Sequence, residues 1–514
     1  MKFNQKLIEG AIEPESEVIL AVDCSFIAKS GKRTYGIDYF YNGSASKTEK
    51  GLEISAMAVV DVNHKLGHSL SVQQTPAQLS SPDKKEQNET TRINHYLTQL
   101  EATVPYLTKL LEKIGVLDKV KAAGFVKKPG VEFFTETTGA LQRQGFTNLA
   151  EGQNSLAFHF NRARFDKLLL EHAEDTGAQV LQEAEVKKLI FEGERIVGVE
   201  YEYQGQRHEA RARFVVDASG RAGVISKQHF KMRKMNGKLK NVAVFQQYKN
   251  VAKENNPTLH KGDFLLSSHE DGWLWGIPIE EDMISVGAVM PLDLLKSSGN
   301  PQDIFNAHCE RAPRIKKTIE GATPVFEKPK VELDFCYISE QLAGPGYFVA
   351  GDAGCFVDPV FSGGTYISMV CGLKAAEAIH KIIEGKEEKE VRNYFENFCK
   401  TGYDSYFRVV YAYYYQFNKD MNRMGLELPG TFRFVLQTFA GDFWGEPDQP
   451  VLSYLRSKKE WDTFEQPFER VYNDCPVYPD VRYRAEDLPH LSHPEDFVEL
   501  IPVEKSEAVV APVS

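Results

Sequence analysis

Residues 347–364 constrain the fold more than any other stretch of this 514-residue chain. They read Tyr-Phe-Val-Ala-Gly-Asp-Ala-Gly-Cys-Phe-Val-Asp-Pro-Val-Phe-Ser-Gly-Gly. The run predicts a buried strand over 347–350, a sharp turn, a loop of small residues, and a helix that continues to about Ile383. A strand that ends in Gly-Asp and reopens as a helix through Ser-Gly-Gly directs backbone N–H groups at an anion or an electron-poor ring. The pattern therefore predicts an α/β fold with a ligand at this turn.

The residue types of this turn suit a flat ligand with a polar chain. Asp352, at the predicted strand end, can accept hydrogen bonds from sugar-like hydroxyls. Four glycines let the backbone approach a flat ring without interference from Cβ atoms: they are Gly351, Gly354, Gly363 and Gly364. An ordinary strand-to-helix turn is the alternative, and it would be favoured for an isolated Gly-Asp pair. The length of the run favours a cofactor.

The composition narrows the range of partners. The formal charge of −11 and the pI of about 5.7 argue against a nucleic-acid-binding surface. The seven cysteines form no Cys-x-x-Cys pair and no zinc spacing, so we expect no metal site and a reducing compartment. The sequence has no signal peptide and no apolar run long enough to cross a bilayer. We expect a soluble cytoplasmic protein without membrane or nucleic-acid partners.

The stretch from 347 to 364 resembles the Gly-Asp segment of flavoprotein monooxygenases and flavin-dependent halogenases. In those families the segment holds the ribityl chain and the edge of the flavin ring. Pro359 and the following Ser362-Gly363-Gly364 resemble the loop at the flavin edge, where Ser362 and Gly363 are expected to hold halide. The resemblance implies that the cofactor is FAD.

Residues 271–278, Asp-Gly-Trp-Leu-Trp-Gly-Ile-Pro, form the most specific motif in the chain. They fit the Trp-x-Trp-x-Ile-Pro motif of flavin-dependent halogenases without a mismatch. Trp273 and Trp275 stand two residues apart, which places both on one face of an extended segment. With Ile277 and Pro278, they are expected to shield the flavin and to prevent direct oxygen transfer to an organic substrate. A half-buried strand with aromatic packing is the alternative that this spacing also suits.

Residues 123–133, Ala-Gly-Phe-Val-Lys-Lys-Pro-Gly-Val-Glu-Phe, resemble the halogenase segment that carries the catalytic lysine. Their spacing favours Lys128 for this role, and the neighbouring Lys127 is the alternative. Oxygen and halide at a reduced flavin yield hypohalous acid, which an amine or ammonium can hold and direct toward an aromatic ring. A partly buried lysine has the adjustable pKa that this role requires. Paired lysines on a loop are otherwise usually solvated.

Two further segments resemble FAD-dependent hydroxylases and halogenases in general. Arg162, in Asn-Arg-Ala-Arg-Phe-Asp at the start of a predicted helix, is expected near the cofactor phosphates or ribose. Arg164 is the alternative for that role. The Val-Asp-Ala-Ser-Gly sequence that contains Asp217 and Gly220 ends a predicted strand, and these residues are expected beside the adenosine half of the cofactor.

Hydrophobic periodicity predicts several other elements. We expect a helix over 107–114, a strand over 178–183 and a β-meander over 186–203. Beyond residue 384 we expect helices with an aromatic run that suits either a helical core or an aromatic substrate pocket, at Tyr406, Phe407, Tyr411, Tyr413, Tyr414, Tyr415 and Phe417. The segment from Glu446 is rich in Pro and charge, as in a tail.

Residues 1–100 differ in character from the rest of the chain. A predicted strand over 18–23 ends in Asp23, and two more strands over 52–62 and 68–73 suit a meander. These pieces resemble the start of DDE transposases of the insertion-sequence 4 type, in which the acid at Asp23 is one of three that hold two metal ions. One carboxylate cannot hold such a site, so we expect Asp23 only to end a strand.

The Gly-x-Gly-x-x-Gly fingerprint that binds the FAD pyrophosphate occurs nowhere in the sequence. We therefore expect an α/β, Rossmann-type FAD-binding fold of the glutathione-reductase and hydroxybenzoate-hydroxylase kind without its first βαβ unit. A mixed β substrate domain and a helical C-terminal region would complete it. The expected divisions are a transposase-like fragment over 1–100, a halogenase core over 101–385 and a helical region over 386–514. We expect FAD binding to be severely weakened.

The resemblance over residues 101–480 implies an FADH2-dependent halogenase that acts on an aromatic ring in secondary metabolism. A separate flavin reductase would supply the reduced cofactor, with O2 and chloride or bromide as co-substrates. The aromatic substrate would be free or tethered to a carrier protein. An FAD-dependent monooxygenase or oxidoreductase is the first alternative. An inactive transposase–halogenase fusion is the second.

Overall fold

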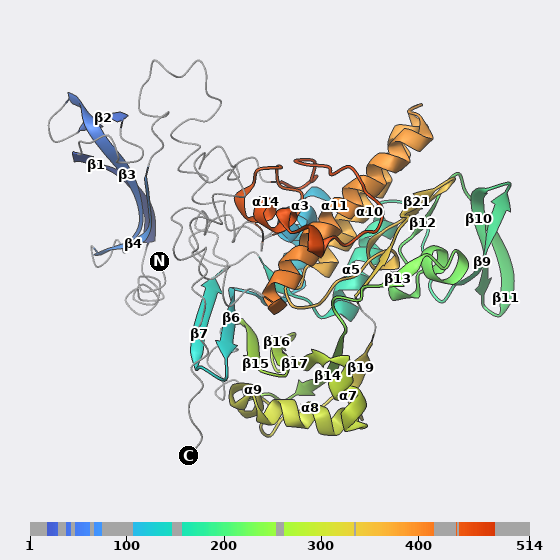
Figure 1. Ribbon diagram of the computed structural model, residues 1–514, viewed down its shortest axis with the longest axis horizontal. Helices are drawn as coiled ribbons and strands as arrows, with labels where there is room; N and C mark the ends of the chain where they lie inside the picture. The colour runs from blue at the N-terminus through green and yellow to red at the C-terminus, as the bar shows by residue number, and fades with distance from the viewer. Residues whose placement is uncertain are drawn as a thin grey trace.

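The computed structural model describes residues 106–145, 157–252, 262–333, 336–415, 438 and 441–478, together with the backbone of four strands before residue 75 (Figure 1). A mixed sheet with helices on one face forms one layer. A second layer contains the two longest described helices, α10 (Gly364–Ile383) and α11 (Glu388–Tyr415), and a small three-stranded sheet. No helix in these ranges has the length and apolarity that a bilayer span needs.

The mixed sheet is antiparallel except for one parallel pair, β15 (Phe264–His269) with β6 (Gly130–Thr135). Its strand order is β18 (Thr323–Pro324), β14 (Asn241–Lys249), β17 (Ile284–Pro291), β16 (Gly272–Pro278), β15 (Phe264–His269), β6 (Gly130–Thr135) and β7 (Ala140–Gly145), with β19 (Lys330–Glu332) also on β14. This agrees with the mixed β layer that the sequence predicts.

The two faces of the mixed sheet differ because successive side chains of a strand point to opposite sides. On one face, Leu274 of β16 packs with Val286 of β17 against Phe305 of α8. The helices that cover this face are α7 (Leu292–Ser298), α8 (Pro301–Glu310) and α9 (Pro313–Thr318). Figure 1 shows them beneath the sheet. The opposite face carries Trp273 and Trp275 and meets the helical layer.

The helical layer is built on a short parallel pair, β12 (Val215–Asp217) with β22 (Tyr347–Val349), extended by β21 (Ala343–Gly344). The predicted strand, turn and helix of residues 347–383 are confirmed, with a 3-10 turn over Gly351–Ala353 between them. α10 buries a stripe at helical spacing: Tyr366, Ile367, Val370, Cys371, Lys374, Ala375 and Ala378. This stripe packs α10 against α11 and the small sheet.

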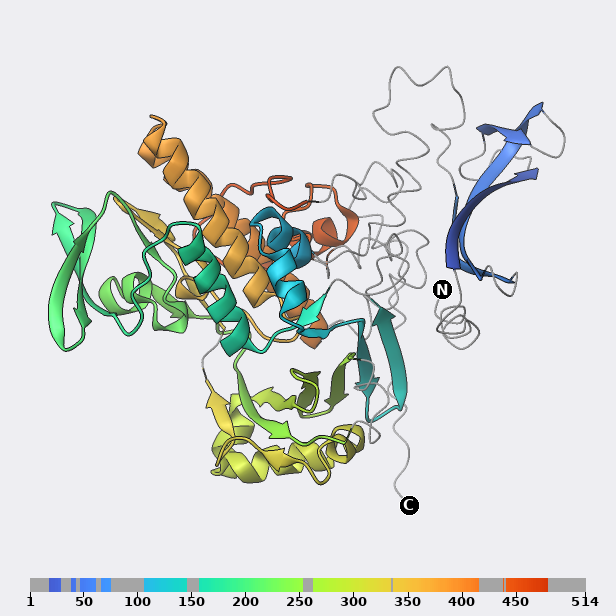
Figure 2. The ribbon, with the colours of Figure 1, turned by 180° about the vertical axis from the view of Figure 1, so that it is seen from behind.

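A third set of elements closes one side of this layer: α3 (Tyr106–Lys113), α4 (Leu117–Ala122), β5 (Val126–Lys127), β8 (Phe158–His159) and α5 (Arg162–Asp175). The side chain of Asn161 caps α5 by accepting from the backbone N–H of Arg164. Phe165 of α5 packs with Leu111 and Phe125 in a buried cluster. Figure 2 shows α5 beside the α10–α11 pair.

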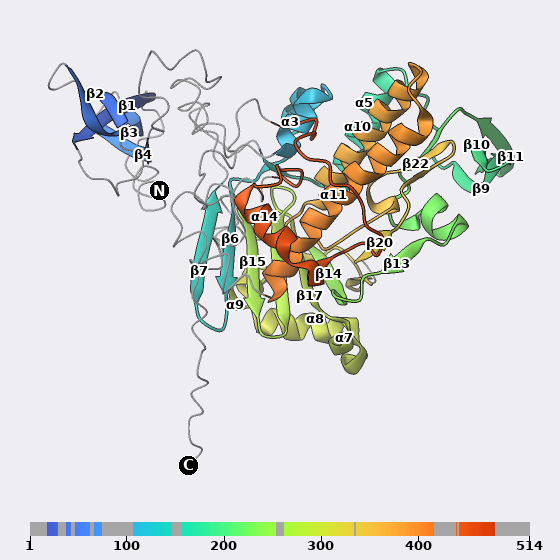
Figure 3. The same cartoon turned by 45° about the horizontal axis from the view of Figure 1, so that its top comes forward.

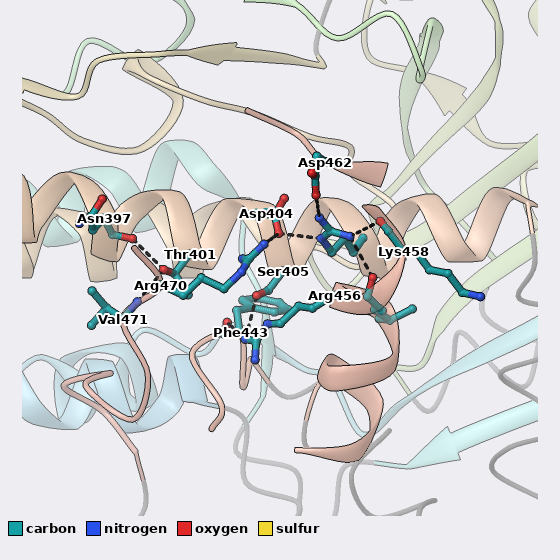
Figure 4. A network of polar contacts seen from close by, with 12 residues as sticks. Asn397, Thr401, Asp404, Ser405, Phe443, Arg456, Lys458, Asp462, Arg470 and Val471 are labelled. Carbon is teal, nitrogen blue, oxygen red and sulfur yellow. Dashed lines mark hydrogen bonds and ion pairs between the residues drawn. The ribbon is translucent and has the colours of Figure 1, made fainter. Parts of the chain in front are cut away.

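The segment predicted as a tail from Glu446 instead folds onto α11. It contains α14 (Pro450–Ser457) and a 3-10 turn over Lys459–Trp461, and Figure 3 shows α14 along α11. Arg408 of α11 is fully buried and joins Asp404, Asp462 and the carbonyls of Leu455 and Lys458. Figure 4 shows Asp404, Lys458 and Asp462 of this network. A buried guanidinium satisfied in this way fixes the segment to the helix.

A small antiparallel arm lies apart from the two main layers. It consists of β9 (Glu185–Glu192), β10 (Arg195–Tyr203) and β11 (Gln206–Arg211), which confirms the predicted meander. The predicted strand over 178–183 is wrong. These residues are mostly exposed and pair with no other described strand, because they have no apolar face to bury. The helical layer contains four further short elements: a 3-10 turn (Gly220–Ala222), a π-helical turn (Val224–His229), β13 (Arg233–Met235) and β20 (Tyr337–Ser339).

Before residue 75 the backbone forms a four-stranded antiparallel sheet. Its strands are β1 (Val18–Ala28), β2 (Asp38–Asn42), β3 (Lys47–Asp61) and β4 (Leu66–Gln74), and β3 pairs with the other three. The predicted pairing of the last two strands is confirmed. The prediction that Asp23 ends its strand is wrong, because β1 continues to Ala28 in register with β3.

Candidate functional site

A cavity of about 670 Å³ lies between the tryptophan-bearing face of the mixed sheet and the helices above it. This volume is in the range of small-molecule binding sites. Ten residues predicted from sequence line it: Lys128, Arg162, Trp273, Trp275, Ile277, Asp352, Pro359, Ser362, Gly363 and Gly364. They come from four separate parts of the chain, so the fold brings the predicted motifs to one site.

The two tryptophans of β16 form one wall of the cavity. Their ring centroids lie 5.9 Å apart, and Trp273 is almost fully buried. Trp275 lies over its cross-strand partner Gly287, where an added Cβ would come within 2.2 Å of the indole. Only glycine fits at that position. Sequence reasoning missed Gly287, since nothing local to β17 signals which residue faces it.

Lys128 follows directly after β5 and enters the cavity, whereas Lys127 is exposed and does not. The Lys128 ammonium lies 5.2 Å from the centre of the Phe264 ring. Burial lowers the pKa of Lys128 from 10.5 to about 8, because the charged form loses water. The geometry therefore distinguishes two neighbours that the sequence left open.

His159 accompanies Lys128 in the cavity wall and was not predicted from sequence. Burial, and then the charge of Lys128, lower the pKa of His159 to about 3. Its Nε2 lies 2.8 Å from the carbonyl of Gly262. A carbonyl only accepts, so this nitrogen carries the proton of a neutral imidazole. The histidine thus adds no second positive charge beside the lysine.

The turn before α10 forms another part of the wall. Ser362 has a left-handed backbone (φ 56°), an uncommon conformation for a residue other than glycine. The N–H of Ser362 donates to the carbonyl of Pro359 at 3.0 Å. The N–H of Gly363 donates to the hydroxyl of Tyr406 at 3.3 Å. The halide role expected of Ser362 and Gly363 stays a prediction.

Asp352 supplies a half-buried carboxylate in the turn after β22. Ser368 of α10 donates to it at 3.2 Å. Burial raises the pKa of Asp352, and the Ser368 hydrogen bond and the charges of Arg162, Arg221 and Arg233 act in the opposite direction. Its position suits acceptance of hydrogen bonds from ligand hydroxyls. Arg162 lines the cavity while it pairs with Asp166 one turn along α5.

Six residues predicted for the site lie outside the cavity lining: Arg164, Asp217, Gly220, Gly351, Gly354 and Pro278. Arg164 pairs with Glu280 and the carbonyl of Ala123 instead. The carboxylate of Asp217 accepts from the N–H groups of Ser219 and Ile225, which holds the turn after β12.

Two of the glycines outside the lining, Gly351 and Gly354, are closely packed, whereas a Cβ at Gly220 would meet no atom within 4 Å. Gly351 has a left-handed φ of 61°, and an added Cβ would lie 2.6 Å from the Ser368 hydroxyl. A Cβ at Gly354 would lie 2.5 Å from Leu342. Both positions keep Asp352 and its turn close to α10 and the small sheet.

Comparison with known proteins assigns the chain to a family. A family model described as tryptophan halogenase matches residues 119–425, which is more than half of the 514 residues. The chain belongs to the tryptophan halogenase family. The match leaves residues 1–100 outside it. The transposase resemblance of that block receives no support from these comparisons and stays a prediction.

Individual relatives agree with the family match. The chain is 29% identical over 314 residues to a tryptophan 2-halogenase of Chondromyces crocatus, covering 60% of this chain and 59% of the relative. It is 31% identical over 339 residues to the flavin-dependent halogenase armH3 of Armillaria mellea, covering 62% and 66%. The chain thus spans roughly three fifths to two thirds of the length of these curated relatives.

Solved structures of halogenases share the fold. The chain is similar to the flavin-dependent brominase Bmp2 with a TM-score of 0.62 and 25% identity, covering 70% of this chain and 87% of that one. It is similar to the myxobacterial chondrochloren halogenase CndH, described as a variant of FAD-dependent halogenases, with a TM-score of 0.56 and 27% identity, covering 67% and 85%. The expected α/β architecture is therefore shown, apart from the N-terminal block.

The residues around the cavity fit the ring and polyol chain of a flavin. The indoles of β16 offer a flat aromatic wall, the turn at Ser362 brings backbone close, and Asp352 is a half-buried acceptor for hydroxyls. The fit does not extend to a pyrophosphate motif, because the sequence contains no Gly-x-Gly-x-x-Gly. The ring end of the cofactor site is thus the part that these residues support.

Proposed function

We propose that this chain is a reduced-FAD-dependent halogenase that chlorinates or brominates an aromatic ring, with Lys128 as the residue that guides the electrophile. The observation that supports this most is that Lys128, Trp273 and Asp352 line one cavity although they come from three distant parts of the chain. Reduced FAD, O2 and halide would supply hypohalous acid in that cavity. The same proposal includes the cofactor or halide roles of six lining residues: Arg162, Asp352, Pro359, Ser362, Gly363 and Gly364.

Lys128 suits the handling of a small neutral oxidant. With a pKa of about 8 it remains mostly protonated at pH 7, and roughly one tenth is neutral amine. The ammonium donates a hydrogen bond to the oxygen of hypohalous acid, and the amine can accept electrophilic halogen. Two neighbours of Lys128 in the cavity wall, Phe264 and the neutral His159, carry no charge of their own.

The tryptophans and the turn before α10 exclude water from the cavity and position the bound molecules. The indole wall of Trp273 and Trp275 keeps water and bulky groups away from that side of the cavity. Asp352, fixed by Ser368, orients a polyol chain. The tryptophans and Asp352 thus hold the bound molecules in place near Lys128. They take no part in the chemical step itself.

The relatives indicate the range of aromatic substrates. Their names specify tryptophan, sulochrin and a pyrrole-2-carbonyl group on a peptidyl carrier protein. We infer an electron-rich aromatic substrate of this kind for the chain, free or carrier-bound, in secondary metabolism. A separate flavin reductase is the expected partner.

The test supplies the full chain with FAD, a flavin reductase, reduced nicotinamide, oxygen and chloride or bromide. Phenol, indole and pyrrole probes, free and carrier-tethered, are then analysed by mass spectrometry for the isotope pattern of the halogen. We expect halogenated product, and a loss of at least about 100-fold in Lys128→Met. Lys127→Met, one residue away and exposed, is the matched control and should keep its rate.

The same assay separates the alternatives. A hydroxylated product would favour an FAD-dependent monooxygenase. Absence of both products, together with no flavin binding, would favour an inactive fusion. Equal losses in Lys127→Met and Lys128→Met would contradict the role of Lys128.

A further inference from the structure

A buried carboxylate lies directly behind the cavity wall, in the loop that leads to α10. Asp358 is 1% exposed and is not part of the cavity lining. Three groups donate to its carboxylate: the N–H of Val360 at 3.0 Å, the hydroxyl of Tyr414 at 3.0 Å and the amide of Asn241 at 3.5 Å. A buried acid that is so fully coordinated holds its surroundings in one arrangement.

Tyr414 connects this carboxylate to the tryptophan wall. Its hydroxyl donates to Asp358 and accepts from the indole N–H of Trp273 at 2.8 Å. Trp273 belongs to β16 of the mixed sheet, Tyr414 to α11 of the helical layer, and Asp358 to the loop before α10. One hydroxyl thus joins both layers that enclose the cavity.

Tyr406, two turns earlier on α11, fixes the same loop through its backbone. Its hydroxyl donates to the carbonyl of Asp358 at 2.8 Å and accepts from the N–H of Gly363 at 3.3 Å. An added Cβ at Gly363 would lie 2.8 Å from the Tyr406 ring. The loop is therefore tied to α11 at two points, which helps to hold Ser362 in its left-handed conformation.

We propose that Tyr414 is a positioning residue that couples Trp273 to Asp358, so that the indole wall and the Ser362–Gly364 turn keep a fixed spacing across the cavity. That this spacing serves to hold a flavin ring between the indole wall and the turn rests on the proposed function. The coupling itself is a property of the chain without its cofactor. It gives the aromatic run of α11 a role beyond core packing.

The electrostatics make the coupling measurable. Burial raises the pKa of Asp358 to about 7, against the hydrogen bonds from Val360, Tyr414 and Asn241. The other titratable groups that face it are Tyr406 and Tyr413 of α11 and Cys336 before β20. Burial raises the pKa of each of these, so they stay uncharged near neutral pH. Asp358 is then the group of this set that changes charge there.

The experiment uses tryptophan fluorescence of the full chain without FAD. Subtracting the emission of Trp273→Phe isolates the Trp273 signal from the other three tryptophans. We expect this signal to titrate with a midpoint near pH 7 and to lose the titration in Asp358→Asn. In Tyr414→Phe the titration of the Trp273 signal should lose most of its amplitude, because the hydroxyl that joins the indole to the carboxylate is absent. The midpoint of the remaining signal should rise by about one to two pH units, because the carboxylate loses a hydrogen bond that favours its charged form.

Ser285→Ala is the matched control. Ser285 of β17 accepts from the indole N–H of Trp275, so its removal changes the second tryptophan of β16 and leaves the Trp273 hydrogen bond in place. Its midpoint should equal that of the parent. A folded Tyr414→Phe with the parent midpoint and emission would overturn the coupling.

If Tyr414→Phe does not fold, the NMR resonance of the Trp273 indole N–H in the parent chain decides. Slow exchange and the same midpoint support the coupling, and fast exchange or no titration overturns it. Since none of these measurements uses FAD or halide, failure of the halogenase assay leaves them interpretable.

Discussion

At the scale of single residues, the site contains groups held in states that cost stability. Lys128 is the clearest, because burial lowers its pKa from 10.5 to about 8. The unfolded chain then binds more protons than the folded chain between about pH 8 and pH 10.5, so stability rises with pH across that window. Below pH 8 the full cost of the buried ammonium is present.

Lys128→Met should therefore increase the free energy of unfolding at pH 7 by about 1–3 kcal/mol while it abolishes halogenation. The gain should shrink as the pH rises above 8, because the parent then loses its charge at little cost. Urea titrations at pH 7 and pH 9.5 measure both quantities. Exposed Lys127→Met should change stability by less than about 0.5 kcal/mol. A destabilised Lys128→Met at pH 7 would contradict the burial argument.

Ser362 is a second such residue, since its φ of 56° is unfavourable for a side chain. Ser362→Val should destabilise the fold by about 1–2 kcal/mol, because a β-branched residue tolerates this conformation poorly. Ser362→Gly should stay within about 0.5 kcal/mol of the parent, since glycine adopts the conformation freely. Thermal unfolding of the three proteins tests the order. Equal melting temperatures for Val and Gly would mean that the turn relaxes.

At the scale of elements, α11 organises the site because it contacts both the cavity and the C-terminal segment. Tyr406 lines the cavity, and Arg408, half a turn later on the opposite side, is buried against residues 455–462. The register of α11 relative to the site thus depends on a charged network far from the chemistry. Asp404 completes it by pairing with both Arg408 and Arg470.

Arg408→Leu should cost about 3–5 kcal/mol, because it leaves the buried Asp404 with less compensation and removes four hydrogen bonds. Arg207→Leu is the control, as Arg207 is exposed on β11 with a long ion pair to Glu200, and it should cost less than about 0.5 kcal/mol. Denaturant unfolding compares the two. Similar losses would show that the network contributes no more than a surface pair.

At the scale of the whole molecule, the residues that suit a flavin ring line one cavity, and the sequence lacks the motif that binds the pyrophosphate. We expect FAD and FMN to bind with affinities within about tenfold of each other. Without a motif for the pyrophosphate, the adenosine half of FAD should add little to the binding free energy. Quenching of flavin fluorescence on titration with the full chain measures both. A purified protein that retains stoichiometric FAD and rejects FMN would show that another part of the chain supplies the phosphate cradle.

The sequence by itself determined the features that depend on local spacing. Ser-Gly-Gly before an apolar stripe at helical period predicted α10, and the two-residue spacing of Trp273 and Trp275 predicted a shared face, because strand side chains alternate. The motifs also indicated the family that the comparison then showed. The strand predicted over 178–183 is wrong, because these residues have no apolar face to bury.

Tertiary structure alone decided which residues meet. It separated Lys128 from Lys127, committed Asp217 to its own turn, placed Gly287 beneath Trp275, and joined Asp358, Tyr414 and Trp273 from three elements. Apart from the Asp217 turn, whose partner Ser219 is two residues away, none of these contacts has a local signal, because each depends on how far-separated segments pack. Burial then set the pKa values of Lys128 and Asp358, since loss of water is a property of the folded interior rather than of the sequence near a residue.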